Sequence, residues 1–113
     1  MKVLNSEFEI FEMIESTDMA VIYFTGMDCG ACEAIKFKVE EILKRFPNIK
    51  SGEINGEKHP SICAKFDVFS VPVFLLYVDK KESLRIGRNV DLISLEGKIQ
   101  RYYEMIYEND LKW

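Results

Sequence analysis

The stretch Ala20–Phe24 (AVIYF), followed by Thr25–Asp28 (TGMD) and Cys29–Cys32 (CGAC), decides how this chain folds. The first segment is short, β-branched and aromatic, which predicts a buried strand. The second segment breaks that pattern, and residues from Glu33 to Phe46 then carry apolar side chains at helical spacing. The sequence therefore places two thiols in the first turn of a helix that leaves the end of a strand.

The position of these thiols favours redox chemistry. The thiolate is the form that attacks disulfides, and a helix N-terminus favours negative charge. Residues three apart on a helix have Cβ atoms roughly 5–6 Å apart, so small shifts bring Cys29 and Cys32 within range of a disulfide. We expect this pair to open and close with little movement of the chain. A static disulfide and half of a zinc site are the alternatives.

Length and composition narrow the class of protein. The 113 residues suffice for a single core, and we expect one domain over residues 1–113. Apolar residues make up 48% and charged residues 30%, which disfavours a disordered chain. The net charge of −4, with no Lys/Arg cluster, disfavours nucleic-acid binding. The apolar runs are too short to cross a bilayer, and no signal-peptide core is present. Three cysteines without an export signal then indicate a reducing compartment, which predicts a cytoplasmic location.

Strands and helices alternate along the chain, which predicts an α/β fold with one mixed sheet covered on both faces. The predicted strands are Lys2–Leu4, Met19–Thr25, Lys50–Asn55, Val73–Val78 and Glu82–Ile86. The predicted helices are about Ser6–Ser16, Gly30–Phe46, Ser61–Phe66 and Asp91–Tyr107. We expect the core to contain Phe8, Phe11, Phe37, Phe66, Phe69 and Phe74, and Trp113 to be exposed.

Three motifs at element boundaries carry a family likeness. Cys29–Cys32 follows the second predicted strand, Val71-Pro72 precedes the fourth, and Gly87 follows the fifth. With these motifs the chain resembles the thioredoxin family over its whole length. The resemblance implies a thioredoxin fold, with a central mixed sheet of four to five strands. It also implies a cis proline at Pro72 that faces the disulfide, because proline alone adopts the cis form at low cost and has no N–H. The Val71 backbone would then pair with an extended substrate.

The resemblance also implies a mechanism and partners. Cys29 would attack a substrate disulfide, and Cys32 would resolve the mixed disulfide. Gly30, Ala31 and Gly87 would contribute to the substrate-binding surface. The redox-active Cys29–Cys32 disulfide would serve without any other cofactor and without a metal. The implied partners are disulfide-bearing proteins and an NADPH-dependent flavoprotein reductase, and the chain would act as a monomer.

The chain departs from the family pattern beside the thiols. Asp28 and Ala31 stand where the family usually has Trp and Pro, and Glu33 stands where it often has Lys. A carboxylate ~7 Å from Cys29 in water-like surroundings costs its thiolate roughly 0.6 kcal/mol, under half a pKa unit. The helix terminus contributes ~0.3–1 kcal/mol in the opposite sense. Because the two effects nearly cancel, we expect a reductant rather than a strong oxidant.

The family also places a buried carboxylate behind the resolving cysteine, as a proton acceptor. That position is Tyr23 here, which cannot act as a base near neutral pH. Glu53, on the neighbouring strand, stands where the family often has Lys. We expect Glu53 to accept the proton of Cys32, with a possible hydrogen bond to Tyr23. The alternative is a solvated glutamate at a strand edge.

Other residues of the cleft indicate an unusual substrate surface. Gly56 stands where the family tends to have an apolar side chain, and Arg88 follows Gly87. Together with Asp28, these residues predict a contact surface more polar than usual.

Two kinds of alternative remain: a metal site that includes Cys63, and a related class of protein. His59 and Cys63 have zinc-ligand spacing when combined with Cys29–Cys32. We expect instead that Cys63 packs as a small apolar residue and that His59 is a loop residue. A glutaredoxin would show a Gly-Gly-x-Asp turn after the fourth strand, and Val78–Lys81 has none. A thioredoxin-fold binding module or redox sensor is the alternative from another class.

Overall fold

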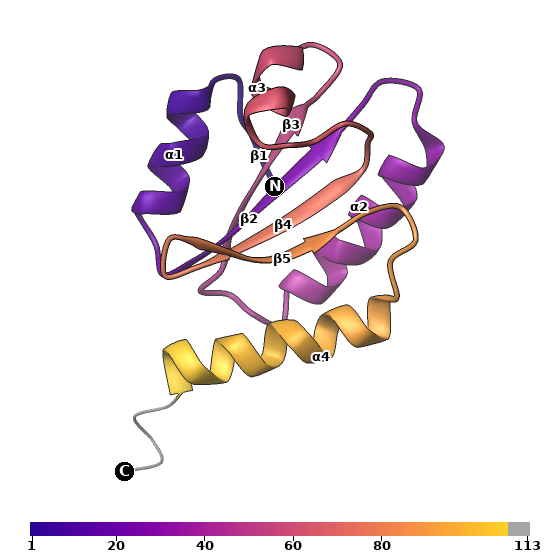
Figure 1. The fold of residues 1–113 in the computed structure, drawn as a ribbon. Coiled ribbons are helices and arrows are strands. Elements are labelled where there is room, and N and C mark those ends of the chain that lie inside the picture. Colours follow the sequence, from indigo (N-terminus) through magenta and orange to yellow (C-terminus); the bar gives the residue numbers. More distant parts are fainter. Residues whose placement is uncertain (109–113) are drawn as a thin grey trace.

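The computed structural model describes residues 1–108, which form a five-stranded mixed sheet with helices on both faces (Figure 1). The elements are β1 (Lys2–Val3), α1 (Glu7–Glu15), β2 (Met19–Thr25), α2 (Gly30–Leu43), β3 (Lys50–Asn55), α3 (Pro60–Lys65), β4 (Val73–Val78), β5 (Lys81–Ile86) and α4 (Leu92–Tyr103), followed by a π-helical turn (Glu104–Glu108). The strand order is β1-β3-β2-β4-β5, with β2 parallel to β3 and antiparallel to β4. Trp113 lies outside the described residues. Within residues 1–108, no helix is long and apolar enough to cross a membrane.

The central strand β2 explains how the two layers assemble. All seven of its residues are buried, and their side chains alternate between the two faces of the sheet. Met19, Val21 and Tyr23 pack into the cluster under α2 and α4. Ile22 and Phe24 pack into the second cluster, which contains residues of α1 and α3. Figure 1 shows α2 and α4 on one face of the sheet and α1 and α3 on the other.

The expected strands agree closely with the structure, whereas two helices end differently. The helix expected to reach Phe46 ends at Leu43, because the N–H groups of Arg45 and Phe46 bond to carbonyls three residues back. Pro47 follows and cannot continue a helix. The last helix was expected as one α-helix to Tyr107, but α4 ends at Tyr103 and continues as the π-helical turn.

The expectation that six phenylalanines fill the core is wrong for four of them. Only Phe66 and Phe74 are buried, whereas Phe8, Phe11, Phe37 and Phe69 are exposed. On α1 the buried side chains are Ile10 and Ile14, which lie one turn apart. Phe8 precedes Ile10 by two residues and therefore points away from the sheet. Phe11 lies at the edge of the buried face, where its ring packs against Phe66 at 5.6 Å between centroids.

Candidate functional site

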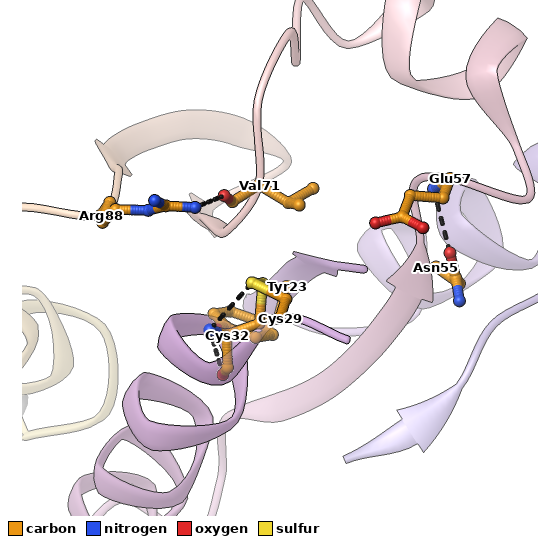
Figure 2. The surroundings of a disulfide bond; sticks show 7 residues. All are labelled: Tyr23, Cys29, Cys32, Asn55, Glu57, Val71 and Arg88. Atoms are coloured by element: carbon orange, nitrogen blue, oxygen red, sulfur yellow. Dashed lines mark hydrogen bonds between the residues drawn. A yellow bond between two sulfur atoms is a disulfide. The ribbon is translucent and has the colours of Figure 1, made fainter. Parts of the chain in front are cut away.

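The two thiols of the Cys-x-x-Cys motif form a disulfide at the start of α2 (Figure 2). Cys29 is the N-cap residue, and its Sγ accepts a hydrogen bond from the backbone N–H of Cys32 at 3.2 Å. The two Cα atoms lie 5.2 Å apart. Cys29 is half-buried, whereas Cys32 is fully buried. Only Cys29 therefore offers its sulfur to a partner from outside.

A second segment, Val71-Pro72, lies in the loop that leads into β4. The peptide bond between the two residues is cis, and Pro72 is buried. Pro72 and Gly87 line the same small pocket as Tyr23, so the structure brings these parts of the chain together. The carbonyl oxygen of Val71 accepts a hydrogen bond from Arg88 Nη2 at 3.0 Å. The backbone acceptor that we expected to receive a substrate strand is therefore occupied by a side chain of this protein.

Tyr23 lies behind Cys32, at the position where the thioredoxin family was expected to have a buried carboxylate. Its hydroxyl donates a hydrogen bond to the carbonyl oxygen of Cys32 at 2.8 Å. Burial, with smaller contributions from the charges of Glu33 and Glu53, raises the pKa of Tyr23 to about 12. The hydroxyl therefore stays protonated at physiological pH and anchors the first turn of α2 without acting as a base.

Glu53 lies beside Tyr23, because the two residues are partners in the β2–β3 register. The expected hydrogen bond between them is absent, since the Tyr23 hydroxyl donates to Cys32 instead. Glu53 Oε2 forms an ion pair with Lys36 Nζ at 2.5 Å, and both side chains are largely buried. Hydrogen bonding to this carboxylate raises the pKa of Lys36. Glu53 is therefore a paired, largely buried carboxylate beside Tyr23 rather than a solvated one at a strand edge.

A groove of about 380 Å³ lies next to Val71 and has the third cysteine in its wall. Its lining residues are Gly56, Glu57, Pro60, Cys63, Ala64, Val68, Phe69, Ser70 and Val71. The Cys63 thiol is free and buried, and it donates to the carbonyl oxygen of Gly56 at 3.5 Å. Burial raises the pKa of Cys63, which disfavours its reactive thiolate. The prediction that Cys63 packs as a small apolar residue is confirmed.

The other half of the hypothetical zinc site does not assemble in the described part of the chain. His59 is the residue before α3 and makes no side-chain cap. Residues 1–108 contain no group of three or more His, Cys, Asp or Glu side chains that could hold a metal ion.

Two residues of the site were missed in the sequence. Lys36 follows Cys32 by one helical turn, and this spacing could have indicated a charge on the same helix face. Glu57 was also missed, because its carboxylate comes close to Gly26 only through the fold. Its Oε1 lies 2.6 Å from the position that a Cβ on Gly26 would occupy.

Comparisons with known proteins agree with this geometry. The family model described as thioredoxin matches residues 1–101. The thioredoxin-like protein YdfQ of Bacillus subtilis is 36% identical over 107 residues, covering 95% of each chain. Among solved structures, a mutant thioredoxin from Halobacterium salinarum superimposes with a TM-score of 0.82 at 18% identity, covering 91% of this chain and 90% of that one. The thioredoxin of Fasciola hepatica superimposes with a TM-score of 0.78 at 27% identity, covering 90% and 99%. With this fold and a Cys-x-x-Cys pair at disulfide distance, the chain belongs to the thioredoxin family of thiol–disulfide oxidoreductases.

Proposed function

We propose that this oxidoreductase works in the reducing direction, with Cys29 as the nucleophile and Cys32 as the resolving thiol. The Cys29 thiolate forms a bond to one sulfur of a substrate disulfide, and the other substrate sulfur leaves as a thiolate. Cys32 then attacks Cys29 Sγ, so that the second substrate sulfur leaves and the Cys29–Cys32 disulfide forms. Two electrons pass from the protein dithiol to the substrate, which gains two protons.

The observation that carries this assignment of roles is the difference in exposure between the two sulfurs. Cys29 is half-buried, whereas Cys32 is fully buried, so a bulky protein disulfide reaches only Cys29. Val71, Pro72, Gly30, Ala31 and Gly87 form the substrate surface around it. Gly30 and Gly87 are exposed with open space beside each Cα, which leaves room for a substrate chain.

The charges around Cys29 support a reductant. A strong oxidant of this kind owes its potential to a stabilised thiolate. Here Asp28 and Glu33 are exposed carboxylates on either side of the motif, and Lys36 is held by Glu53. The contributions that favour the thiolate are the helix N-terminus and one backbone N–H, from Cys32.

Glu53 is the proton acceptor of Cys32 in this proposal. Its position beside Tyr23 supports this role, and its ion pair to Lys36 holds the carboxylate in place at the side of α2. We expect Glu53→Gln to slow the resolving step several-fold and to change its pH dependence, because a general acid–base group contributes to rate through its ionisation. The decay of a Cys29 mixed disulfide, followed by mass against pH, measures this step. An unchanged profile in Glu53→Gln would contradict the role, and Glu41→Gln, which removes an exposed carboxylate of α2, is the control.

The remaining parts of the proposal concern the cellular setting. The protein works as a monomeric single domain over residues 1–113 in the cytoplasm. It uses the Cys29–Cys32 disulfide with no other cofactor and is recycled by an NADPH-dependent flavoprotein reductase. A reducing pool keeps the Cys29–Cys32 pair as a dithiol and sustains turnover in this direction.

An equilibrium redox titration tests the direction. The protein is incubated in glutathione or dithiothreitol buffers, its free thiols are alkylated, and the adducts are counted by mass. A reductant should show a two-electron couple near ~−270 mV that involves Cys29 and Cys32, with Cys63 always free. A couple near ~−180 to −120 mV would indicate an oxidant or isomerase. The absence of any reversible couple would favour a binding module.

A further inference from the structure

The positively charged side chain of Arg88 contacts the backbone of Val71, near the disulfide. Its Nη2 donates to the Val71 carbonyl oxygen at 3.0 Å, and its side chain is exposed. Within residues 1–108 the guanidinium lies within 4 Å of no carboxylate, and Val71 is its only hydrogen-bond partner. A guanidinium has five N–H donors, so most of its donors are free to bind a ligand.

Glu57 carries the opposite charge to the other side of Val71. A Cβ built on Gly26 would lie 2.6 Å from Glu57 Oε1 and 3.0 Å from Val71 Cγ2, so the carboxylate and this methyl group converge on Gly26. The Glu57 backbone N–H is held by Asn55 Oδ1 at 2.9 Å. No cation of the described residues lies within 4 Å of the Glu57 carboxylate. Figure 2 shows Arg88 and Glu57 on opposite sides of Val71, with the disulfide between them in the view.

We propose that Arg88 and Glu57 make this cleft selective for protein disulfides whose attacked cysteine lies between an acidic and a basic side chain. The acidic side chain binds Arg88, and the basic side chain binds Glu57. This specificity rests on the proposed function, because it assumes that a substrate chain lies along Val71.

The hydrogen bond to Val71 makes substrate entry an exchange of donors. A backbone N–H of the substrate replaces the guanidinium at the Val71 carbonyl, so this acceptor stays satisfied. Arg88 then loses its protein partner, and a carboxylate of the substrate supplies a new one through charge-assisted hydrogen bonds. An uncharged substrate returns the guanidinium to water and gains nothing from this exchange.

Apolar side chains next to the two charges supply contact area without selecting the order of charges. Phe69 is 83% exposed and lines the groove with Val71 and Glu57. Exposed aromatic side chains beside a groove bind many peptides by burial of apolar surface. The charges of Arg88 and Glu57 then determine which peptide reacts fastest and in which direction it lies along the cleft.

Two peptides of equal composition test the proposal. Each is a symmetrical disulfide of a short peptide with a central cysteine, flanked by Glu and Lys in one order or in the reverse order. A third peptide carries Gln at both flanks. The pre-reduced full chain is mixed with each peptide, and the single-turnover rate is followed by alkylation and mass. Uncharged hydroxyethyl disulfide reports exchange through Cys29 and Cys32 without these charges.

We expect one order of charges to react about threefold to tenfold faster than the reverse order, the combined effect of two exposed charge contacts. The Gln peptide should lie between them, and salt should reduce the difference. The double variant Arg88→Glu/Glu57→Lys should invert the preference, whereas Arg88→Lys should keep its direction. The double variant Arg101→Glu/Glu12→Lys exchanges the same charges on α4 and α1 and should keep the wild-type preference.

Equal rates for the two orders, with normal reduction of hydroxyethyl disulfide, would overturn this inference and leave the proposed function intact. A preference that survives Arg88→Glu/Glu57→Lys would also overturn it. Failure to reduce any of these disulfides would overturn the proposed function, and the inference with it.

Discussion

A neutral tyrosine occupies a fully buried position behind the disulfide. Tyr23 is fully buried, and its hydroxyl has one partner, the carbonyl oxygen of Cys32. An ionised group at this position would lose its hydration and would need a partner of opposite charge. The phenol avoids this cost, since it is neutral below its raised pKa of about 12. The carboxylate that pairs with this position across the sheet is Glu53, on the next strand.

Tyr23→Phe should lower the free energy of unfolding of the oxidised protein by ~0.5–1.5 kcal/mol at pH 7, because the buried hydrogen bond from the Tyr23 hydroxyl to the carbonyl of Cys32 is lost. The same change should reduce the alkaline loss of stability. The unfolded chain releases the phenol proton near pH 10 and the folded chain near pH 12, so stability falls with rising pH between these values. For one proton the slope is at most about 1.4 kcal/mol per pH unit. Urea unfolding at pH 7, 10 and 11 measures both effects, and parallel pH curves for the two proteins would contradict the prediction.

Gly56 and Cys63 fit together by size. A Cβ on Gly56 would lie 2.8 Å from Cys63 Sγ and 3.3 Å from Val71 Cγ1. Gly56→Ala should therefore destabilise the fold by ~1–3 kcal/mol through overpacking. Cys63→Ala should recover most of this loss in the double variant, which a double-mutant cycle in urea would show as a favourable coupling.

Gly97 is the matched control for that cycle. It lies inside α4 with nothing within 4 Å of its would-be Cβ. Gly97→Ala should therefore stabilise the protein by ~0.5–1 kcal/mol, since alanine loses less backbone entropy in a helix. An equal response at both glycines would show that Cys63 does not constrain Gly56.

At the scale of elements, one arginine of β5 connects the edge of the sheet to the end of α3. Arg85 donates to the carbonyl oxygens of Phe66 at 2.8 Å and Asp67 at 3.0 Å. Its Nε and Nη2 also bind the two carboxylate oxygens of Glu82 at 3.0 and 2.8 Å. The hydrogen bond to Arg85 lowers the pKa of Glu82. The pair holds the guanidinium where it satisfies backbone acceptors that α3 leaves free at its C-terminus.

Arg85→Met should lower the free energy of unfolding by ~1–2 kcal/mol, since two carbonyls lose their donor. Glu82→Gln should lower it by under ~1 kcal/mol, because the ion pair is partly exposed and screened by solvent. The two losses differ in pH dependence. The lowered pKa of Glu82 means that its contribution is present above its ordinary pKa of 4.5 and disappears as the pH falls through the folded value. Urea unfolding at pH 7 and pH 3 should show a smaller effect of Glu82→Gln at pH 3 than at pH 7, with part of the Arg85→Met effect persisting. An effect of Glu82→Gln that is as large at pH 3 would contradict this account.

The strands could be predicted from the sequence because their pattern is local. Met19–Thr25, Lys50–Asn55 and Val73–Val78 are bounded as expected, since apolar runs and turn residues specify them without reference to the rest of the chain. The exposed phenylalanines could not be predicted from residue type, because helix phase decides burial. On α1, Ile10 and Ile14 set that phase and leave Phe8 outside.

The candidate site divides in the same way. The Cys29–Cys32 pair and the Val71-Pro72 segment follow from motifs at element boundaries, and Figure 2 shows Val71 in the surroundings of the disulfide. The contacts of Arg88, Glu57 and Lys36 join residues that are 17 or more apart in sequence, so they depend on the sheet order and on loop paths. The residue pattern of a single helix or strand therefore does not predict these contacts.

At the scale of the whole molecule, the disulfide links redox chemistry to the stability of the fold. The difference in free energy of unfolding between the oxidised and reduced proteins equals the difference in electron-transfer free energy between the unfolded and folded chains. A strong oxidant stabilises its reduced form through a low thiol pKa. In this site Asp28 and Glu33 lie beside Cys29, Tyr23 donates to a carbonyl rather than to a sulfur, and Cys32 is fully buried. Burial and like charges both disfavour a thiolate, so the reduced protein gains little.

The oxidised protein should therefore be more stable than the reduced protein, by on the order of 2 kcal/mol for closure of so short a loop. Urea unfolding of both forms in a Cys63→Ala background measures this difference without disulfide exchange through the third thiol. Cys29→Ser/Cys32→Ser, which forms no bridge, should unfold close to the reduced form. Since 30 mV corresponds to about 1.4 kcal/mol, the measured difference also predicts how far the potential of the folded protein lies below that of its unfolded chain. A reduced form more stable than the oxidised form would mean that the fold favours the dithiol. The chain would then be an oxidant despite its acidic flanking residues.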